Sequence, residues 1–216
     1  YVYAKNLVIW DTDNCGIPKI LKPSEIAPNI RKALVSANFL GPVSIEAVGK
    51  PLKDFITQEL RSTGIRVTPV YSDKLNASDI RIVARMCMWV LDNIDPANIL
   101  LVSGDGDYCD VMDHLRVRGH NLMIAQILKS SNLNLKVTSK FVWEWINLAS
   151  GGGQLSEEEK IQIREKYCSK YLSTKPKSEI AEAPLIRCER CFDLLQVPKR
   201  DQKLTCRCSY LIDLTS

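Results

Sequence analysis

Residues 5–14 read Lys-Asn-Leu-Val-Ile-Trp-Asp-Thr-Asp-Asn, a short apolar run followed directly by acids. The run has the length of a buried strand. Four similar runs follow at residues 43–48, 65–71, 98–103 and 121–127, and segments of helical spacing lie between them. Strands that alternate with helices predict an α/β fold, in which a mostly parallel sheet is covered by helices on both faces.

The spacing of apolar residues also predicts where the helices lie. The expected helices cover residues 23–39, 51–62, 76–94, 107–118 and 141–148. The last of them is predicted from the spacing of Phe141, Trp145 and Leu148. The residues expected on one apolar face of the long helix over 76–94 are Ile80, Val83, Ala84, Cys87, Val90 and Leu91.

The composition excludes several classes of protein. Of the 216 residues, 45% are hydrophobic and 25% are charged, which is ordinary globular usage and not that of a disordered tail or a coiled coil. No apolar run approaches the roughly 18 residues of a membrane span. The net charge of +4 comes from 29 basic and 25 acidic residues, and residues 1–150 hold 17 and 15 of them, so a polyanion-binding tail is not expected.

No apolar segment follows a basic start, so the sequence shows no secretory signal peptide. We therefore expect an intracellular protein, and the sequence does not distinguish the cytoplasm, the nucleus and an organelle such as the mitochondrion. Because the chain begins at Tyr1 rather than Met, a targeting segment could precede it.

Acidic side chains gather where the predicted strands end. Asp11 and Asp13 follow the first strand, Asp105 and Asp107 follow the fourth, and Asp79 falls in the first turn of the long helix. Ligands of parallel α/β sheets bind outside the carboxyl ends of the strands, where the strand order reverses. If the first and fourth strands are neighbours, these carboxylates converge at one mouth. Their mutual repulsion is best compensated by a divalent cation with oxygen ligands, Mg²⁺ or Mn²⁺.

Two other interpretations of these acids stay open. Each aspartate taken alone also suits a helix cap or a turn. A strand that ends in Asp-x-Asp is also typical of phosphatases of the haloacid dehalogenase type. In that case Asp11 would be the nucleophile, Asp13 the general acid, and Asp105 with Asp110 a later metal motif.

Three stretches of the first 150 residues resemble the NYN domain family, the PIN-like ribonucleases, and most closely the limkain type. They are Val8–Cys15 with Pro18, Asn76–Asp79 and Leu101–Tyr108. The resemblance implies a PIN-like, Rossmann-like α/β/α sandwich and a metal-dependent endoribonuclease that cleaves mostly single-stranded RNA. One or two Mg²⁺ or Mn²⁺ ions would activate a water and neutralise charge on the scissile phosphate.

The resemblance also implies roles for individual residues. The catalytic, metal-binding acids would be Asp11, Asp79 and Asp105, with Asp107 as a fourth. The residues that hold the site together or contact the substrate would be Asp13, Asn14 and Ser103. Some family members place an acid at the end of the second strand, where this chain has Gly49 and Lys50, while Glu46 lies inside the strand. A catalytically weak or inactive RNA-binding adaptor of the same fold is therefore the main alternative.

Basic residues near the predicted mouth are candidates to bind the RNA backbone. Lys50 and Lys53 are the first of these, and the others are Lys19, Lys22, Lys74, Arg81 and Arg85. We expect structural roles for His114 and His120, the only histidines, because the metal can do the acid–base work.

Four of the eight cysteines form two close pairs near the C-terminus, Cys188 with Cys191 and Cys206 with Cys208. Two pairs of thiolates suit a tetrahedral, structural Zn²⁺ site, although free cysteines or a disulfide remain alternatives. Residues 194–197 and 210–212 alternate like short strands, so a zinc ribbon is predicted. It could bind RNA or a partner protein.

These patterns predict three regions. Residues 1–150 would form the nuclease domain and residues 185–216 the zinc ribbon. Residues 151–184 between them would be a linker that contains a charged helix, with Ser156 as the N-cap. The oligomeric state does not follow from the sequence.

Overall fold

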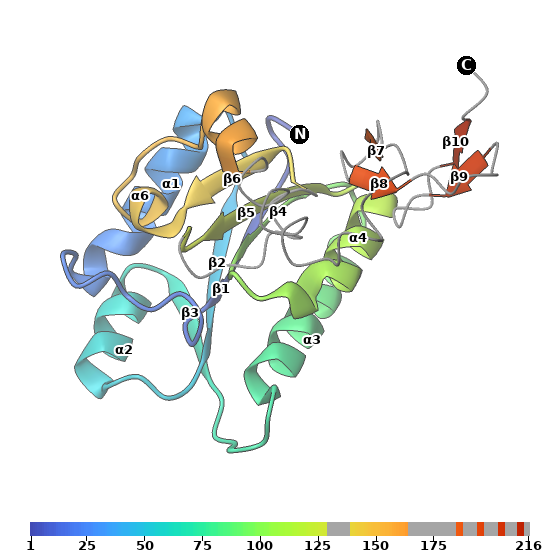
Figure 1. Ribbon diagram of the computed structural model, residues 1–216. Coiled ribbons are helices and arrows are strands. Elements are labelled where there is room, and N and C mark those ends of the chain that lie inside the picture. Colours follow the sequence, from blue (N-terminus) through green and yellow to red (C-terminus); the bar gives the residue numbers. More distant parts are fainter. Residues whose placement is uncertain (129–138, 164–184, 188–193, 197–202, 206–210, 214–216) are drawn as a thin grey trace, which may run out of the picture. The chain divides into compact units, whose positions relative to one another are not determined.

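Parallel strands form the central sheet of a computed structural model of the chain, in the order β3-β2-β1-β4-β5-β6 (Figure 1). The structure describes residues 1–128 and 139–163 and, further on, the backbone of four short strands. The strands of the sheet are β1 (Asn6–Asp11), β2 (Val43–Gly49), β3 (Ile65–Pro69), β4 (Asn98–Val102), β5 (Asn121–Gln126) and β6 (Phe141–Glu144). Each pairs with its neighbours in parallel, which confirms the predicted α/β fold.

Alternating side chains of the strands build two hydrophobic cores, one on each face of the sheet. On β1, Val8 and Trp10 point into one core, whereas Leu7 and Ile9 point into the other. Every residue of β1 and β4 is buried, as expected for parallel strands covered on both faces. Helices cover both faces of the sheet (Figure 1).

The helices of this unit are α1 (Pro23–Ser36), α2 (Asp54–Ser62), α3 (Ala77–Asp92), the 3-10 helix η1 (Gly106–Tyr108), α4 (Cys109–Val117) and α6 (Trp145–Ala149). Helices α1 and α6 pack into the core of Val8 and Trp10, and α3 and α4 pack into the other. Helices α2 and α4 are followed by Gly64 and Gly119, whose φ angles of 87° and 89° are the left-handed values at which helices commonly end. None of the helices in the described residues is both long and apolar enough to cross a membrane.

The prediction of a helix over residues 141–148 is wrong in its first half. Residues 141–144 form β6, which pairs with β5, and only Trp145–Ala149 is helical. Val142 and Trp143 are both buried, as the aromatic and β-branched residues of a strand tend to be. The helical spacing arose because Phe141 begins β6 and Trp145 begins α6, so the four-residue interval spans two different elements. Trp145 packs on Trp10, with ring centroids 4.9 Å apart.

The predicted inner face of the long helix is wrong for four of its six residues, whereas Val90 is buried and Val83 packs against the core as predicted. Helix α3 buries Ile82, Met86 and Val90 against the sheet. The residues of the predicted face that the structure leaves exposed are Ile80, Ala84, Cys87 and Leu91. The helix is apolar on more than one side, so periodicity could not identify the side that faces the sheet.

The chain divides into two compact units, and the second contains residues 136–138 and 156–216. Ser156 is an N-cap, as predicted: its Oγ accepts a hydrogen bond from the backbone N–H of Glu159 at 3.2 Å, and Glu159 Oε2 accepts one from the N–H of Ser156 at 2.7 Å. The described strands further on form two antiparallel pairs, β7 (Leu185–Arg187) with β8 (Leu194–Gln196) and β9 (Lys203–Thr205) with β10 (Leu211–Asp213). The four cysteines of the predicted zinc ribbon lie outside the described residues, so the ribbon stays a prediction, as do the three predicted regions.

Candidate functional site

A cavity of about 380 Å³ lies at the carboxyl edge of the sheet. Strands β1 and β4 are neighbours, as the convergence of the acids required. The β1 loop contributes Asp11, Asp13 and Asn14 to the lining of the cavity, and the segment that enters α3 contributes residues 72–79. Lys50 after β2 and Asp105 after β4 complete it. The structure thus brings together four of the five predicted aspartates and leaves out Asp107.

Asp11 is the most enclosed of these acids. It ends β1 and is 2% exposed. Its Oδ1 accepts hydrogen bonds from the backbone N–H groups of Asp13 and Asn14, both at 3.1 Å, and its Oδ2 accepts one from Ser103 Oγ at 2.9 Å. Burial nevertheless raises the pKa of Asp11 above its ordinary value, and the charge of Asp79 raises it further, against these hydrogen bonds.

Tyr108 joins Asp11 to Asp79. Its ring is fully buried beside α3, and its hydroxyl lies 2.8 Å from Asp79 Oδ1 and 3.3 Å from Asp11 Oδ2. Burial and the two carboxylates raise the pKa of this hydroxyl, so it keeps its proton and donates it. Sequence reasoning assigned no role to Tyr108. Its place three residues after Asp105, at the start of a helix beside the acids, was the available signal.

Asp13 and Asn14 connect the β1 loop to three other segments. Asp13 Oδ1 accepts a hydrogen bond from the backbone N–H of Lys50 at 2.8 Å, and its Oδ2 accepts one from Ser78 Oγ at 2.7 Å. Asn14 Oδ1 accepts a hydrogen bond from the N–H of Gly104 at 3.0 Å. These bonds tie β1 to the ends of β2 and β4 and to the start of α3. Ser78 is a second residue that the sequence reasoning missed.

The acids after β4 belong to a tight turn. Asp105 is the N-cap of η1, and its Oδ1 accepts a hydrogen bond from the N–H of Asp107 at 3.0 Å. Ser103 Oγ accepts one from the N–H of Asp105 at 3.2 Å while it donates to Asp11. Asp105 is partly exposed and lines the cavity, whereas Asp107 is exposed and lies outside the lining.

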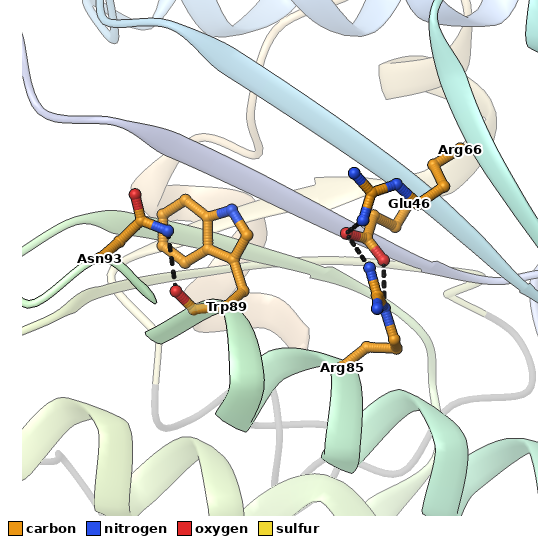
Figure 2. Close-up of polar contacts among 5 residues, drawn as sticks. All are labelled: Glu46, Arg66, Arg85, Trp89 and Asn93. Carbon is orange, nitrogen blue, oxygen red and sulfur yellow. Dashed lines mark hydrogen bonds and ion pairs between the residues drawn. The ribbon is translucent and has the colours of Figure 1, made fainter. Parts of the chain in front are cut away.

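A side chain at Gly49, the last residue of β2, would have to displace side chains of the loop that follows β1. A Cβ atom on Gly49 would collide with Thr12 Oγ1 and Asp13 Oδ1. Glu46, the acid inside the strand, is buried and engaged by two arginines, as Figure 2 shows. Arg85 contacts both of its carboxylate oxygens, at 2.7 and 2.8 Å, and Arg66 contacts one at 3.3 Å. Glu46 is therefore not a free ligand, and the carboxylate raises the pKa of Arg85.

The basic and histidine residues predicted to lie near the site differ in whether they line the cavity. Lys50 lines the cavity, Lys53 does not, and Arg85 is held by Glu46. Neither histidine contributes to the lining. His120 is buried, its Nδ1 accepts a hydrogen bond from the N–H of Ala97 at 3.2 Å, and burial lowers its pKa.

The donor set can be compared with the needs of a divalent cation. No group of three or more acidic, histidine or cysteine side chains in the described residues is close enough to form a metal cage. Mg²⁺ commonly binds to one or two carboxylates and keeps several waters. Asp11 and Asp79, which meet at one hydroxyl, fit this mode of binding, and the raised pKa of Asp11 indicates a carboxylate that a cation would stabilise.

Comparison with known protein families gives a match to the NYN domain over residues 5–146. The matched segment contains every residue of the cavity lining and all strands of the parallel sheet. The comparison with curated proteins gave no match.

Proposed function

Because this chain belongs to the NYN domain family of PIN-like ribonucleases, we propose that it is an endoribonuclease that hydrolyses single-stranded RNA with Mg²⁺ or Mn²⁺. One observation carries the proposal. Asp11, Asp79 and Asp105 come from three distant segments and line one cavity at the carboxyl edge of the sheet. That edge is where parallel α/β sheets bind their ligands.

In this proposal Asp11 and Asp79 hold the cation, and Asp105 contributes from the turn that follows β4. When bound, the cation would supply positive charge beside the scissile phosphate and acidify the attacking water. Ser103 and Tyr108 fix the orientation of the Asp11 and Asp79 carboxylates through their hydroxyl groups. Asp107 would contribute only its N–H, which holds Asp105 in place.

The substrate contacts follow from the same cavity. Lys50 is positioned to bind a phosphate of the RNA backbone, and Asp13 and Asn14 keep the rim of the cavity together. Asp11 is buried, and a flexible single strand can enter a recess of this kind more easily than a rigid duplex can. Because Lys50 would contribute positive charge to this contact, its replacement by Glu should weaken RNA binding at low salt.

The test is cleavage of a labelled single-stranded RNA with Mg²⁺, Mn²⁺ or EDTA. We expect metal-dependent cleavage that falls by at least about 100-fold in Asp79→Asn and in Asp105→Asn, since even outer partners of metal ligands commonly cost 10–100-fold. The matched control is Asp110→Asn, because Asp110 is exposed and does not line the cavity. If all variants cleave like the wild type, the activity does not come from this site.

The main alternative is an RNA-binding adaptor without turnover. Two observations favour it: the described acids form no group of three around a metal position, and β2 ends in Gly49 rather than in an acid. An adaptor would bind the RNA with undiminished affinity in EDTA and leave it intact in all metals.

The phosphatase alternative needs a free Asp13 and an active Asp110, whereas both oxygens of Asp13 accept hydrogen bonds. Hydrolysis of a generic phosphomonoester that is lost in Asp110→Asn would support that alternative.

We also propose a structural Zn²⁺ bound by Cys188, Cys191, Cys206 and Cys208, on the strength of their spacing. Elemental analysis of the purified chain should give one zinc per chain. The double variant Cys188→Ser and Cys206→Ser should lose it, whereas Cys87→Ser, at an exposed free cysteine, should keep it. RNA binding by these variants would decide whether the ribbon contacts RNA or a partner protein.

A further inference from the structure

Helix α3 presents a continuous apolar stripe to the outside. Ile80 is 69% exposed and Leu91 is 73% exposed, and Ile94, the second residue after the end of the helix, is 91% exposed. Ala84 and Cys87, which lie between them along the helix, are exposed as well. No described residue covers these side chains, although the opposite side of the helix is packed against the sheet.

The spacing of the stripe is that of a helix-pairing seam. Its members on the helix follow one another at intervals of 4, 3 and 4 residues, from Ile80 through Ala84 and Cys87 to Leu91, and Ile94 lies beyond the end of the helix at Asp92. A repeat of this kind keeps the apolar residues on the line along which two helices pack. A single exposed apolar residue needs no explanation, but a contiguous exposed stripe marks an interaction surface.

The charged residues at the two ends of the stripe have opposite signs, so they could pair between two copies of the chain. Arg81 flanks its beginning and Asp95 follows its end, and both are exposed. Neither has an ion-pair partner among the described residues. In a two-fold antiparallel pair of helices, Arg81 would face the partner subunit's Asp95 at both ends. A parallel pair would instead place each charge beside its like.

We propose that the outer face of α3 is a homodimer interface, in which the α3 helices of two copies of this chain pack antiparallel about a two-fold axis near Cys87. Such an interface is isologous, so each contact occurs twice. The seam of one helix is smaller than a standard interface, and the dimer therefore forms in a concentration-dependent manner.

The arrangement leaves both cavities open. Residues 72–79, which line the cavity, precede and begin α3, so the two cavities lie toward opposite ends of the paired helices. A helix of 16 residues is about 24 Å long. Asp79 is joined to Tyr108 inside its own subunit, away from the stripe. The inference is therefore independent of whether the cavity cleaves RNA.

The test is sedimentation velocity of the full chain over a wide range of concentrations. The wild type should shift from the mass of one chain to that of two as the concentration rises. Leu91→Glu should abolish the shift, whereas Val35→Glu, at an exposed apolar position of α1, should retain it. Thermal unfolding of each variant checks that it folds.

Charge reversal tests the antiparallel geometry. Arg81→Glu and Asp95→Arg alone should each raise the dissociation constant of the dimer, by about tenfold. The double variant should restore the affinity of the wild type, because the pairs re-form with opposite sign. A chain that stays monomeric at every concentration, a dimer that survives Leu91→Glu, or a double variant as weak as the single ones would each overturn the proposal. A lower unfolding temperature of Leu91→Glu without any change of mass would mean that another part of the same chain covers the stripe.

Discussion

The two sides of the cavity are held in different ways. The acids on the side of β1 and α3 are bonded across long stretches of sequence, Asp11 to Ser103 and Tyr108, and Asp13 to Ser78 and Lys50. The acids on the side of β4 are bonded within their own turn, Asp105 to the N–H of Asp107. A side that is braced from several elements keeps its geometry when the substrate arrives, whereas a turn can adjust to it.

The braced side depends on the position of α3, and Glu46 fixes that position. Glu46→Ala would leave Arg85 beside the sheet without its partner, and removal of one member of a buried ion pair is costly. Because the Arg85 side chain is 25% exposed, we expect a loss at the low end, about 3 kcal/mol of the free energy of unfolding. Arg66→Ala, at a side chain that is 65% exposed, should cost under about 0.5 kcal/mol. Urea unfolding measures the free energy of unfolding of both variants. Equal losses in Glu46→Ala and Arg66→Ala would show that the contact between Glu46 and Arg85 adds no stability.

Tyr108→Phe removes the hydroxyl that joins Asp11 to Asp79 and leaves the packing of the ring intact. We expect a loss of about 1–2 kcal/mol of stability, because a buried hydrogen bond to charged groups is lost. Metal-dependent RNA cleavage should fall by about 10–100-fold, the usual effect of removing a group that orients metal ligands. Tyr71→Phe, at an exposed tyrosine, is the control. A Tyr108→Phe enzyme of full activity would mean that the two carboxylates need no common donor.

Asp11 makes the stability of the braced side depend on pH. Burial raises its pKa in the folded chain above the ordinary value of 3.8, so the folded chain holds this proton more tightly than the unfolded chain does. Its contribution is therefore most favourable below 3.8 and is lost as the pH rises through the raised pKa. The stability of Asp11→Asn relative to the wild type should therefore increase as the pH rises above 3.8. Thermal unfolding at several pH values without divalent cations measures this, and a difference that is constant with pH would contradict it.

The smallest effect should come from Asp107. Its side chain is exposed and lies outside the cavity, so Asp107→Asn should change the rate of RNA cleavage and the stability very little, by under about 0.5 kcal/mol. Asp105→Asn, two residues away, should nearly abolish cleavage. Parallel cleavage assays of the two variants compare them directly. If Asp107→Asn is as inactive as Asp105→Asn, the turn rearranges when RNA binds and brings Asp107 into the cavity.

Much of the site could be predicted because residues that follow parallel strands must lie at the same edge of the sheet. Once β1 and β4 are neighbours, Asp11 and Asp105 must lie at the same edge, and the first turn of α3 brings Asp79 there. Tyr108 and Ser78 could not be found in this way. A tyrosine or a serine beside an acid in the sequence is common, and only the packing of α3 and η1 decides which carboxylate its hydroxyl reaches.

The sequence by itself determined the alternation of the first five strands with their helices, the α/β class and the edge at which the acids gather, because apolar periodicity and chain connectivity set these features. The tertiary structure decided which side of α3 is buried, which acid became the ion-pair partner of Arg85, and why β2 ends in glycine. These outcomes depend on contacts between residues far apart in the chain. A helix that is apolar on two sides satisfies the same periodicity either way, and only the space left by the sheet selects one of them.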